Sequence, residues 1–231
     1  MDTGKSIRRL PARLGVRCHY SLALLLAAQT VAQTATPCPA NFGPLRYEED
    51  ICRADAAKAL VDTSGFRLRH GGELRQRLTY VKSFEFGASQ NDGDFYATQR
   101  YLVHFDTLVA ESVQVFLQAG SLLEYGLDTG PSPIERNDLD VAQAFLRYRK
   151  GPVRPWLGRR VIQFGSQRLV ARREGPNVRL AFDGGGLEVR LDGFTADVVA
   201  ARAVQVTSRG TFNDFGNSGR WLWGAYTTLG L

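Results

Sequence analysis

The chain has 231 residues, of which 44% are hydrophobic and 23% charged, and its formal net charge is +6. This composition excludes an intrinsically disordered chain and is ordinary for a folded protein of one large or two small domains. Only four of its 29 basic residues are lysine, and the rest are arginine. Arginine prevails where carboxylates or phosphates are bound, because its planar group pairs with them at two points.

Residues 1–32 have the pattern of a secretory signal peptide. Five basic residues precede an apolar run at 22–28, and residues 30–32 provide a cleavage site. The alternative is a membrane anchor, but the run is much shorter than the roughly 20 residues that a spanning helix needs. Removing the five basic residues and Asp2 changes 29 basic and 23 acidic residues to 24 and 22, a net charge of +2. The high pI therefore does not indicate a nucleic-acid partner.

The cysteines agree with export from the cytoplasm. Cys18 lies in the signal peptide, and Cys38 and Cys52 are close enough in sequence to form a disulfide outside the cytoplasm. The alternative is a lipid-modified Cys38, although Thr36 and Pro37 do not form the usual small, apolar recognition sequence.

Residues 33–70 are interpreted as an N-terminal periplasmic extension, because they show no sustained strand alternation. After Gly71 and Gly72, segments with a period of two residues predict an all-β region over 71–231. The eight predicted strands comprise three near 74–86, 96–106 and 112–119, followed by 139–149, 153–163, 187–192, 194–204 and 221–229.

The alternation fits two architectures, which are a secreted antiparallel sandwich and a transmembrane antiparallel β-barrel. The signal peptide, the aromatic residues near strand ends and the charges within strands favour the barrel, because a water-filled lumen tolerates charge. The eight strands either close as a small barrel or form part of a larger one.

Several sequence blocks resemble the alginate-export family of outer-membrane β-barrels. The blocks are RYEED from Arg46, GGELRQR from Gly71, the segment 96–106, LDVAQAF from Leu139 and GRRVIQFGSQRLVARREGPNVRLAFDG from Gly158. The family usually has Gln where this chain has Arg160. The resemblance implies a monomeric barrel, of about eighteen strands in the best-known members, whose arginine-rich lumen passes an anionic polysaccharide.

The last block also stands out by charge, because ten basic residues lie between Arg147 and Phe182 against the single acid Glu174. Bidentate arginine contacts along a pore would favour entry of an anionic polysaccharide or a small anionic solute. The alternative is that individual arginines pair with acids such as Glu174 and merely hold the loop in place. The candidate substrate-binding residues are Arg100, Arg159, Arg160, Arg168, Arg172, Arg173 and Arg179.

Other residues of this block predict structure rather than chemistry. Asn177, Asp183 and Gly184 are assigned to a structural loop, and the glycines at 184–186 predict a tight turn between strands. The sequence contains no HExxH, Walker-type or GxSxG motif, so we expect no enzyme, no cofactor and no metal. The expected protein is a monomeric channel surrounded by outer-membrane lipid. The alternative function is a secreted or periplasmic β-sheet protein that binds acidic polysaccharide without forming a pore.

Overall fold

The computed structural model describes residues 55–82, 93–127 and 130–230. The predicted signal peptide, Cys38 and Cys52 lie outside these residues. The described elements are the short helix α1 (Asp55–Lys58) and the strands β1 (Ala59–Thr63), β2 (Phe66–Lys82), β3 (Gly93–Val109), β4 (Val113–Tyr125), β5 (Asn137–Tyr148), β6 (Val153–Val161), β7 (Ala181–Leu191), β8 (Phe194–Gln205) and β9 (Phe215–Leu229).

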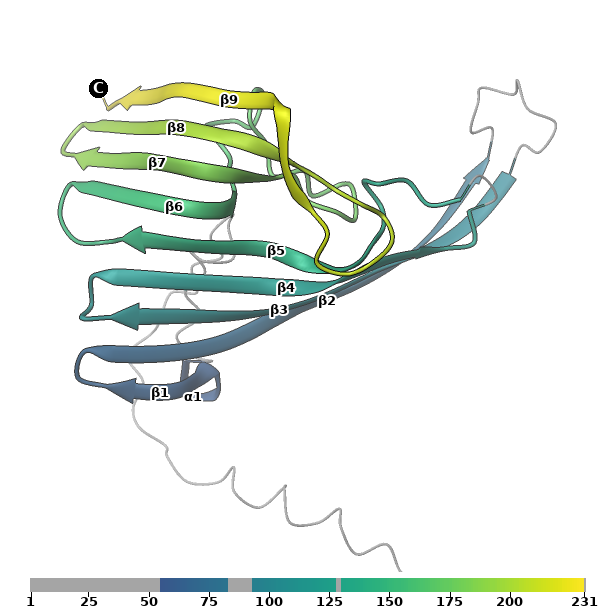
Figure 1. Ribbon diagram of the computed structural model, residues 1–231, viewed down its shortest axis with the longest axis horizontal. Helices are drawn as coiled ribbons and strands as arrows, with labels where there is room; N and C mark the ends of the chain where they lie inside the picture. The colour runs from purple at the N-terminus through teal and green to yellow at the C-terminus, as the bar shows by residue number, and fades with distance from the viewer. Residues whose placement is uncertain (1–54, 83–92, 128–129, 231) are drawn as a thin grey trace, which may run out of the picture. The chain divides into compact units, whose positions relative to one another are not determined.

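The nine described strands form one antiparallel sheet in chain order, in which each strand pairs with the next (Figure 1). β1 and β9 are its edges, and among the described residues the sheet is not closed. The predicted all-β antiparallel fold is confirmed, and the eight predicted strands correspond to β2–β9. Residues with alternating polarity form these strands because successive side chains point to opposite faces of a sheet.

The two faces of the sheet differ in burial as the alternation predicts. In β3, Thr98 and Arg100 are buried, whereas Val103 on the other face is 57% exposed. In β2, Arg75 and Arg77 share the face of Arg100, whereas Leu78 on the opposite face is 72% exposed. We call the face of Thr98 and Arg100 the covered face, because loops lie over it.

The opposite face exposes large apolar side chains along most of the sheet. Soluble proteins rarely expose apolar patches of this extent, whereas a barrel presents such a face to lipid. Members of this set with at least 40% exposure include Leu74, Tyr80, Val103, Phe105, Val115, Leu117, Leu146, Leu157, Leu187, Val198 and Trp223. In the described part of the chain, no helix has the length and apolar character needed to cross a membrane.

The sheet begins before the residue at which the clear alternation starts. We expected the first strand after Gly71, but β1 and β2 already pair from Ala59, with Thr63 opposite Phe66. The connection between them contains only two residues, and Gly65 adopts a positive φ of 91°. Two-residue hairpins commonly use glycine in this conformation, so the Ser64-Gly65 pair was the available sequence signal.

The structure also corrects the predicted turn at the three consecutive glycines. Asp183 and Gly184 lie within β7 rather than in a loop, and β7 continues through Gly186 to Leu191. A Cβ atom at Gly186 would lie 2.7 Å from Nε1 of Trp156 on β6. The absence of a side chain at Gly186 therefore allows the Trp156 indole to lie against β7, and this glycine serves packing rather than a turn.

Substitution of Gly186 by alanine is expected to destabilise the sheet by about 1–3 kcal/mol, because the new methyl group overpacks the contacts with the Val198 carbonyl of β8 and with Trp156. Urea titration of the protein in detergent, followed by tryptophan fluorescence, measures this loss. Gly175→Ala is the control, since no atom lies within 4 Å of the position that its methyl group would take. Equal losses for the two variants would contradict the packing role of Gly186.

Candidate functional site

The connection between β6 and β7, residues 162–180, lies over the covered face, and we call it the β6–β7 loop. The amide of Val178 donates to the carbonyl of Ile134 at 2.8 Å, and that of Phe164 donates to Val170 at 3.1 Å. Gln167 and Arg173 adopt positive φ angles of 61° and 55°. This conformation costs energy for residues other than glycine, so surrounding contacts must hold the loop in its shape.

Four charged side chains join the loop to the sheet. Arg100 donates to Glu73 at 3.0 Å and to Glu174 of the loop at 3.1 Å. Arg179 donates to the same two carboxylates, at 2.8 Å for Glu73 and 2.6 Å for Glu174. Each carboxylate is therefore shared by two guanidinium groups, and we call Glu73, Arg100, Glu174 and Arg179 the four-charge cluster. Buried charges require such pairing, because removing one from water without a partner is costly.

Two arginines of β2 hold the backbone of the same loop. Arg75 donates to the carbonyl oxygens of Glu174 at 3.0 Å and Pro176 at 3.3 Å, and Arg77 donates to that of Gly175 at 2.8 Å. These bonds satisfy carbonyl groups that have no strand partner. The arginines of β2 thus act on the loop as backbone donors.

Asn177 is the most enclosed residue of the loop, with no exposed surface. Its Nδ2 group donates to the carbonyls of Gln99 at 2.9 Å, Glu135 at 3.0 Å and Leu123 at 3.3 Å. Its own carbonyl accepts from Nε of Arg100 at 2.9 Å, and its amide donates to the Glu135 carboxylate at 2.8 Å. Asn177 therefore connects the loop to β3, β4 and the segment before β5.

Arg159 holds a second irregular part of the sheet. It donates two hydrogen bonds to Asp183 on β7, at 2.7 and 3.0 Å, and one each to the carbonyls of Val141 and Asp214 at 3.0 Å. β5 pairs with β6 only over Ala144–Arg147. Arg159 therefore links β6 and β7 to the part of β5 that does not pair with β6, and to the segment before β9.

Arg160 lies beside Trp156 and is also paired with an acid. Its NH2 group is 2.6 Å from the Glu188 carboxylate, and its guanidinium lies 5.0 Å from the centre of the Trp156 ring and 5.5 Å from that of Phe145. Arg160 directly follows Arg159 on β6. Gly158, with a φ of 126°, precedes them and interrupts the regular strand geometry.

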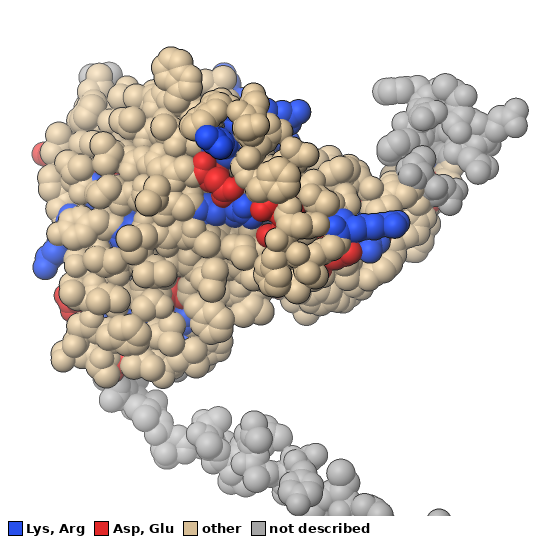
Figure 2. All heavy atoms as spheres, in the orientation of Figure 1, with Lys and Arg blue, Asp and Glu red and all other residues tan. Residues whose placement is uncertain are grey.

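The seven predicted arginines thus form two groups. Arg100, Arg159, Arg160 and Arg179 are engaged with acids and backbone carbonyls. Arg168 and Arg173 are exposed, and Arg172 is partly exposed with its Nε 3.5 Å from Glu174. In the space-filling view of Figure 2, acidic and basic atoms adjoin in one area of a surface that is otherwise mostly uncharged.

An open cavity of about 380 Å³ lies beside the β6–β7 loop. Its lining includes Arg173, Arg179 and Arg220, together with the amide side chains of Gln205 and Asn217, and the described residues that line it include no acid. We call it the basic cavity. Arg220 is not among the candidate residues predicted from the sequence, because it stands outside the arginine-rich block, next to the aromatic Trp221 of β9.

An antiparallel sheet with one exposed apolar face and one charged face covered by a loop is typical of membrane transport barrels. A family model described as "Alginate export" matches residues 66–229. The chain therefore belongs to the alginate-export family, a transport family rather than an enzyme family. Neither the curated proteins nor the solved structures include a match to this chain.

Substitution of Asn177 by alanine is expected to cost about 2–4 kcal/mol, since it leaves buried carbonyl groups without a donor. Chemical unfolding in detergent measures the loss. The matched control is Asn217→Ala, because Asn217 makes its side-chain bonds near the surface. A loss at Asn177 no larger than that at Asn217 would contradict the structural role of Asn177.

Acid is expected to release the loop only near pH 2. Burial raises the pKa of Glu174, but the hydrogen bonds and charges of Arg179 and Arg100 outweigh burial and lower this pKa to about 2. The unfolded value is about 4.3. The stabilisation is therefore complete above about pH 4.3 and is lost as the pH falls through the lowered pKa. Limited proteolysis of the loop at pH 7, 4 and 2 measures this; cleavage that already rises at pH 4 would contradict it.

Proposed function

We propose that the protein is an outer-membrane channel for the passage or export of an anionic polysaccharide or a small anionic solute, and that arginines around the β6–β7 loop make it anion-selective. Family membership and the exposed apolar face support a transport role in a membrane. The loop narrows the space over the covered face, where a solute would pass.

The observation that carries the proposal is the basic cavity. Arg173 and Arg220 are exposed, and the acids of the four-charge cluster do not line the cavity. A polyuronate has a carboxylate on each sugar, and a guanidinium group can bind such a carboxylate through two parallel hydrogen bonds. Solute contacts at exposed arginines stay weak enough for release, because water competes for them.

The division between the two arginine groups also supports the proposal. Arg100 and Arg179 hold the loop through buried contacts, so they fix the position of the loop beside which the basic cavity lies. Arg168 and Arg173 are exposed on the same loop, where a passing anion can contact them, and Arg172 is partly exposed beside Glu174. Exposed charges on a loop that is itself held in place can select by charge while allowing a solute to move on.

The double substitution Arg173→Glu and Arg220→Glu tests the proposal in planar lipid bilayers. The wild type is expected to conduct with a preference for anions, and the variant is expected to lose or reverse this preference. Block of the current by a uronate oligosaccharide should weaken about tenfold, since two exposed contacts, each worth up to about 1 kcal/mol, are lost.

The control is Lys150→Glu, which reverses a charge in the exposed turn between β5 and β6. Its selectivity should stay close to that of the wild type. Unchanged selectivity and block in the double variant would remove the basic cavity from the proposal. A wild-type protein that fractionates as soluble and does not conduct would contradict the channel itself.

A further inference from the structure

A second pocket on the covered face lies where β6, β7 and β8 adjoin. Its volume is about 200 Å³, and none of its lining residues lines the basic cavity. The polar part of the lining is provided by Arg160, Gln163, Glu188, Arg190 and Asp197. These five side chains, and not the exposed arginines of the basic cavity, determine the chemistry of this pocket.

The charges in the pocket are balanced, in contrast to those of the basic cavity. Glu188 pairs with Arg160 at 2.6 Å, and Asp197 pairs with Arg190 at 2.7 Å. A free anion would find each guanidinium already paired with a carboxylate. Donors and acceptors instead lie side by side, an arrangement that suits hydroxyl groups, because each hydroxyl both donates and accepts.

One acceptor of the pocket lacks a partner. Oε1 of Gln163 is buried, and among the described residues it has no hydrogen-bond partner. Buried polar atoms are normally satisfied, so an unsatisfied acceptor at a pocket wall indicates that a donor from water or a ligand belongs there. Gln163 stands next to Phe164, at the point where β6 gives way to the β6–β7 loop.

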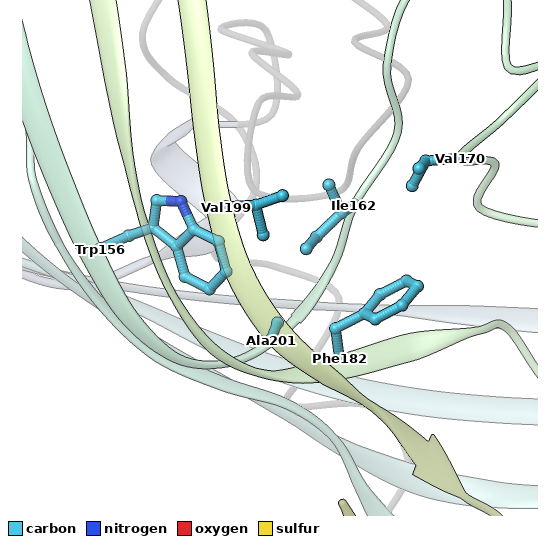
Figure 3. Packing of buried hydrophobic residues seen from close by; sticks show 6 residues of the cluster. All are labelled: Trp156, Ile162, Val170, Phe182, Val199 and Ala201. Atoms are coloured by element: carbon cyan, nitrogen blue, oxygen red, sulfur yellow. The ribbon is translucent and has the colours of Figure 1, made fainter. Parts of the chain in front are cut away.

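The remaining wall of the pocket is apolar and rigid. Trp156, Ile162 and Val199 belong to one buried cluster, and Figure 3 shows their side chains close together. Because Gly186 makes room for the Trp156 ring, the aromatic wall has a fixed position. A pocket with an apolar wall and a few convergent polar groups is the usual form of a small-ligand site.

We propose that this pocket binds one pyranose ring of a saccharide, through its hydroxyl groups and its apolar C–H face. The volume of about 200 Å³ has room for several waters, and so for one ring rather than for several. The inference rests on the proposed function and deepens it: the basic cavity recognises the carboxylates of the chain, and this pocket, here called the ring pocket, recognises the sugar ring.

Fluorescence of Trp156 tests the inference in the detergent-solubilised full-length protein. The chain has three tryptophans, and Trp221 and Trp223 are exposed on β9. In the variant Trp221→Phe and Trp223→Phe, Trp156 is therefore the only tryptophan. Titration with a neutral hexose trisaccharide and with a hexuronate trisaccharide is expected to give a saturable change in emission for both, because both present ring hydroxyls.

Two further substitutions in that background assign the change to the pocket. Asp197→Asn and, independently, Gln163→Ala should each weaken the binding of both saccharides at least about tenfold. Asp192→Asn is the matched control, because it removes the same charge from the exposed turn between β7 and β8, and its affinity should be unchanged. Heat-modifiable gel migration verifies folding. If Asp197→Asn misfolds, the result for Gln163→Ala alone tests whether the saccharides bind in this pocket.

The remaining outcomes separate this inference from the proposed function. A wild-type channel that conducts while neither saccharide changes Trp156 emission would overturn the ring pocket alone. A response to hexuronate only, abolished by Arg173→Glu with Arg220→Glu, would also overturn it, because recognition would then depend on the carboxylate. Saccharide binding that is lost in Gln163→Ala, in a protein that does not conduct, would support the pocket and contradict the channel.

Discussion

The four-charge cluster of Glu73, Arg100, Glu174 and Arg179 is the interaction on which the rest of the site depends. Arg100 has no exposed surface, and the side chains of Glu73 and Arg179 are only about one-tenth exposed. Charges so removed from water must be paired, and here each carboxylate accepts from both guanidinium groups. The pairing connects strands β2 and β3 to a distant loop. Glu73 and Arg179 are 106 residues apart in the chain, and Arg100 and Glu174 are 74 residues apart.

The position of the β6–β7 loop decides which arginines are exposed. With Glu174 and Asn177 fixed against the sheet, Arg173 lies at the basic cavity, while Arg168 stays exposed near the start of the loop. If the loop left the sheet, the buried charges would lose their partners. The cost of that loss keeps the loop in place over the covered face.

The same residue type therefore serves two purposes in this protein. A buried arginine with several acceptors determines structure, as Arg159 does where it joins β5, β6 and β7. An exposed arginine such as Arg220 keeps its hydrogen-bonding capacity for a solute. The ring pocket adds a third arrangement, in which Arg190 is paired with Asp197 and the site is neutral. The proposed sites for charge recognition and for ring recognition thus occupy separate places on one face.

Local patterns predicted the sheet because strand periodicity is a local property. The faces of Arg75, Arg100 and Leu78 follow from alternation, and the eight strands from β2 to β9 follow from its repetition. The three glycines from Gly184 predict a turn locally, because the packing of Gly184 against β8 and of Gly186 against Trp156 depends on other strands. The partners of Arg100 could not be predicted either, since Glu174 lies 74 residues away and no periodicity connects the two.

Amide hydrogen exchange in the β6–β7 loop is the most direct measurement of the central claim, that this loop is fixed against the sheet. The amides of Asn177 and Val178 donate to Glu135 and Ile134. In the folded protein in detergent, they are predicted to exchange as slowly as amides within β7. Exchange at the rate of an unprotected loop would contradict the account, because the arginines would then have no fixed position over the covered face.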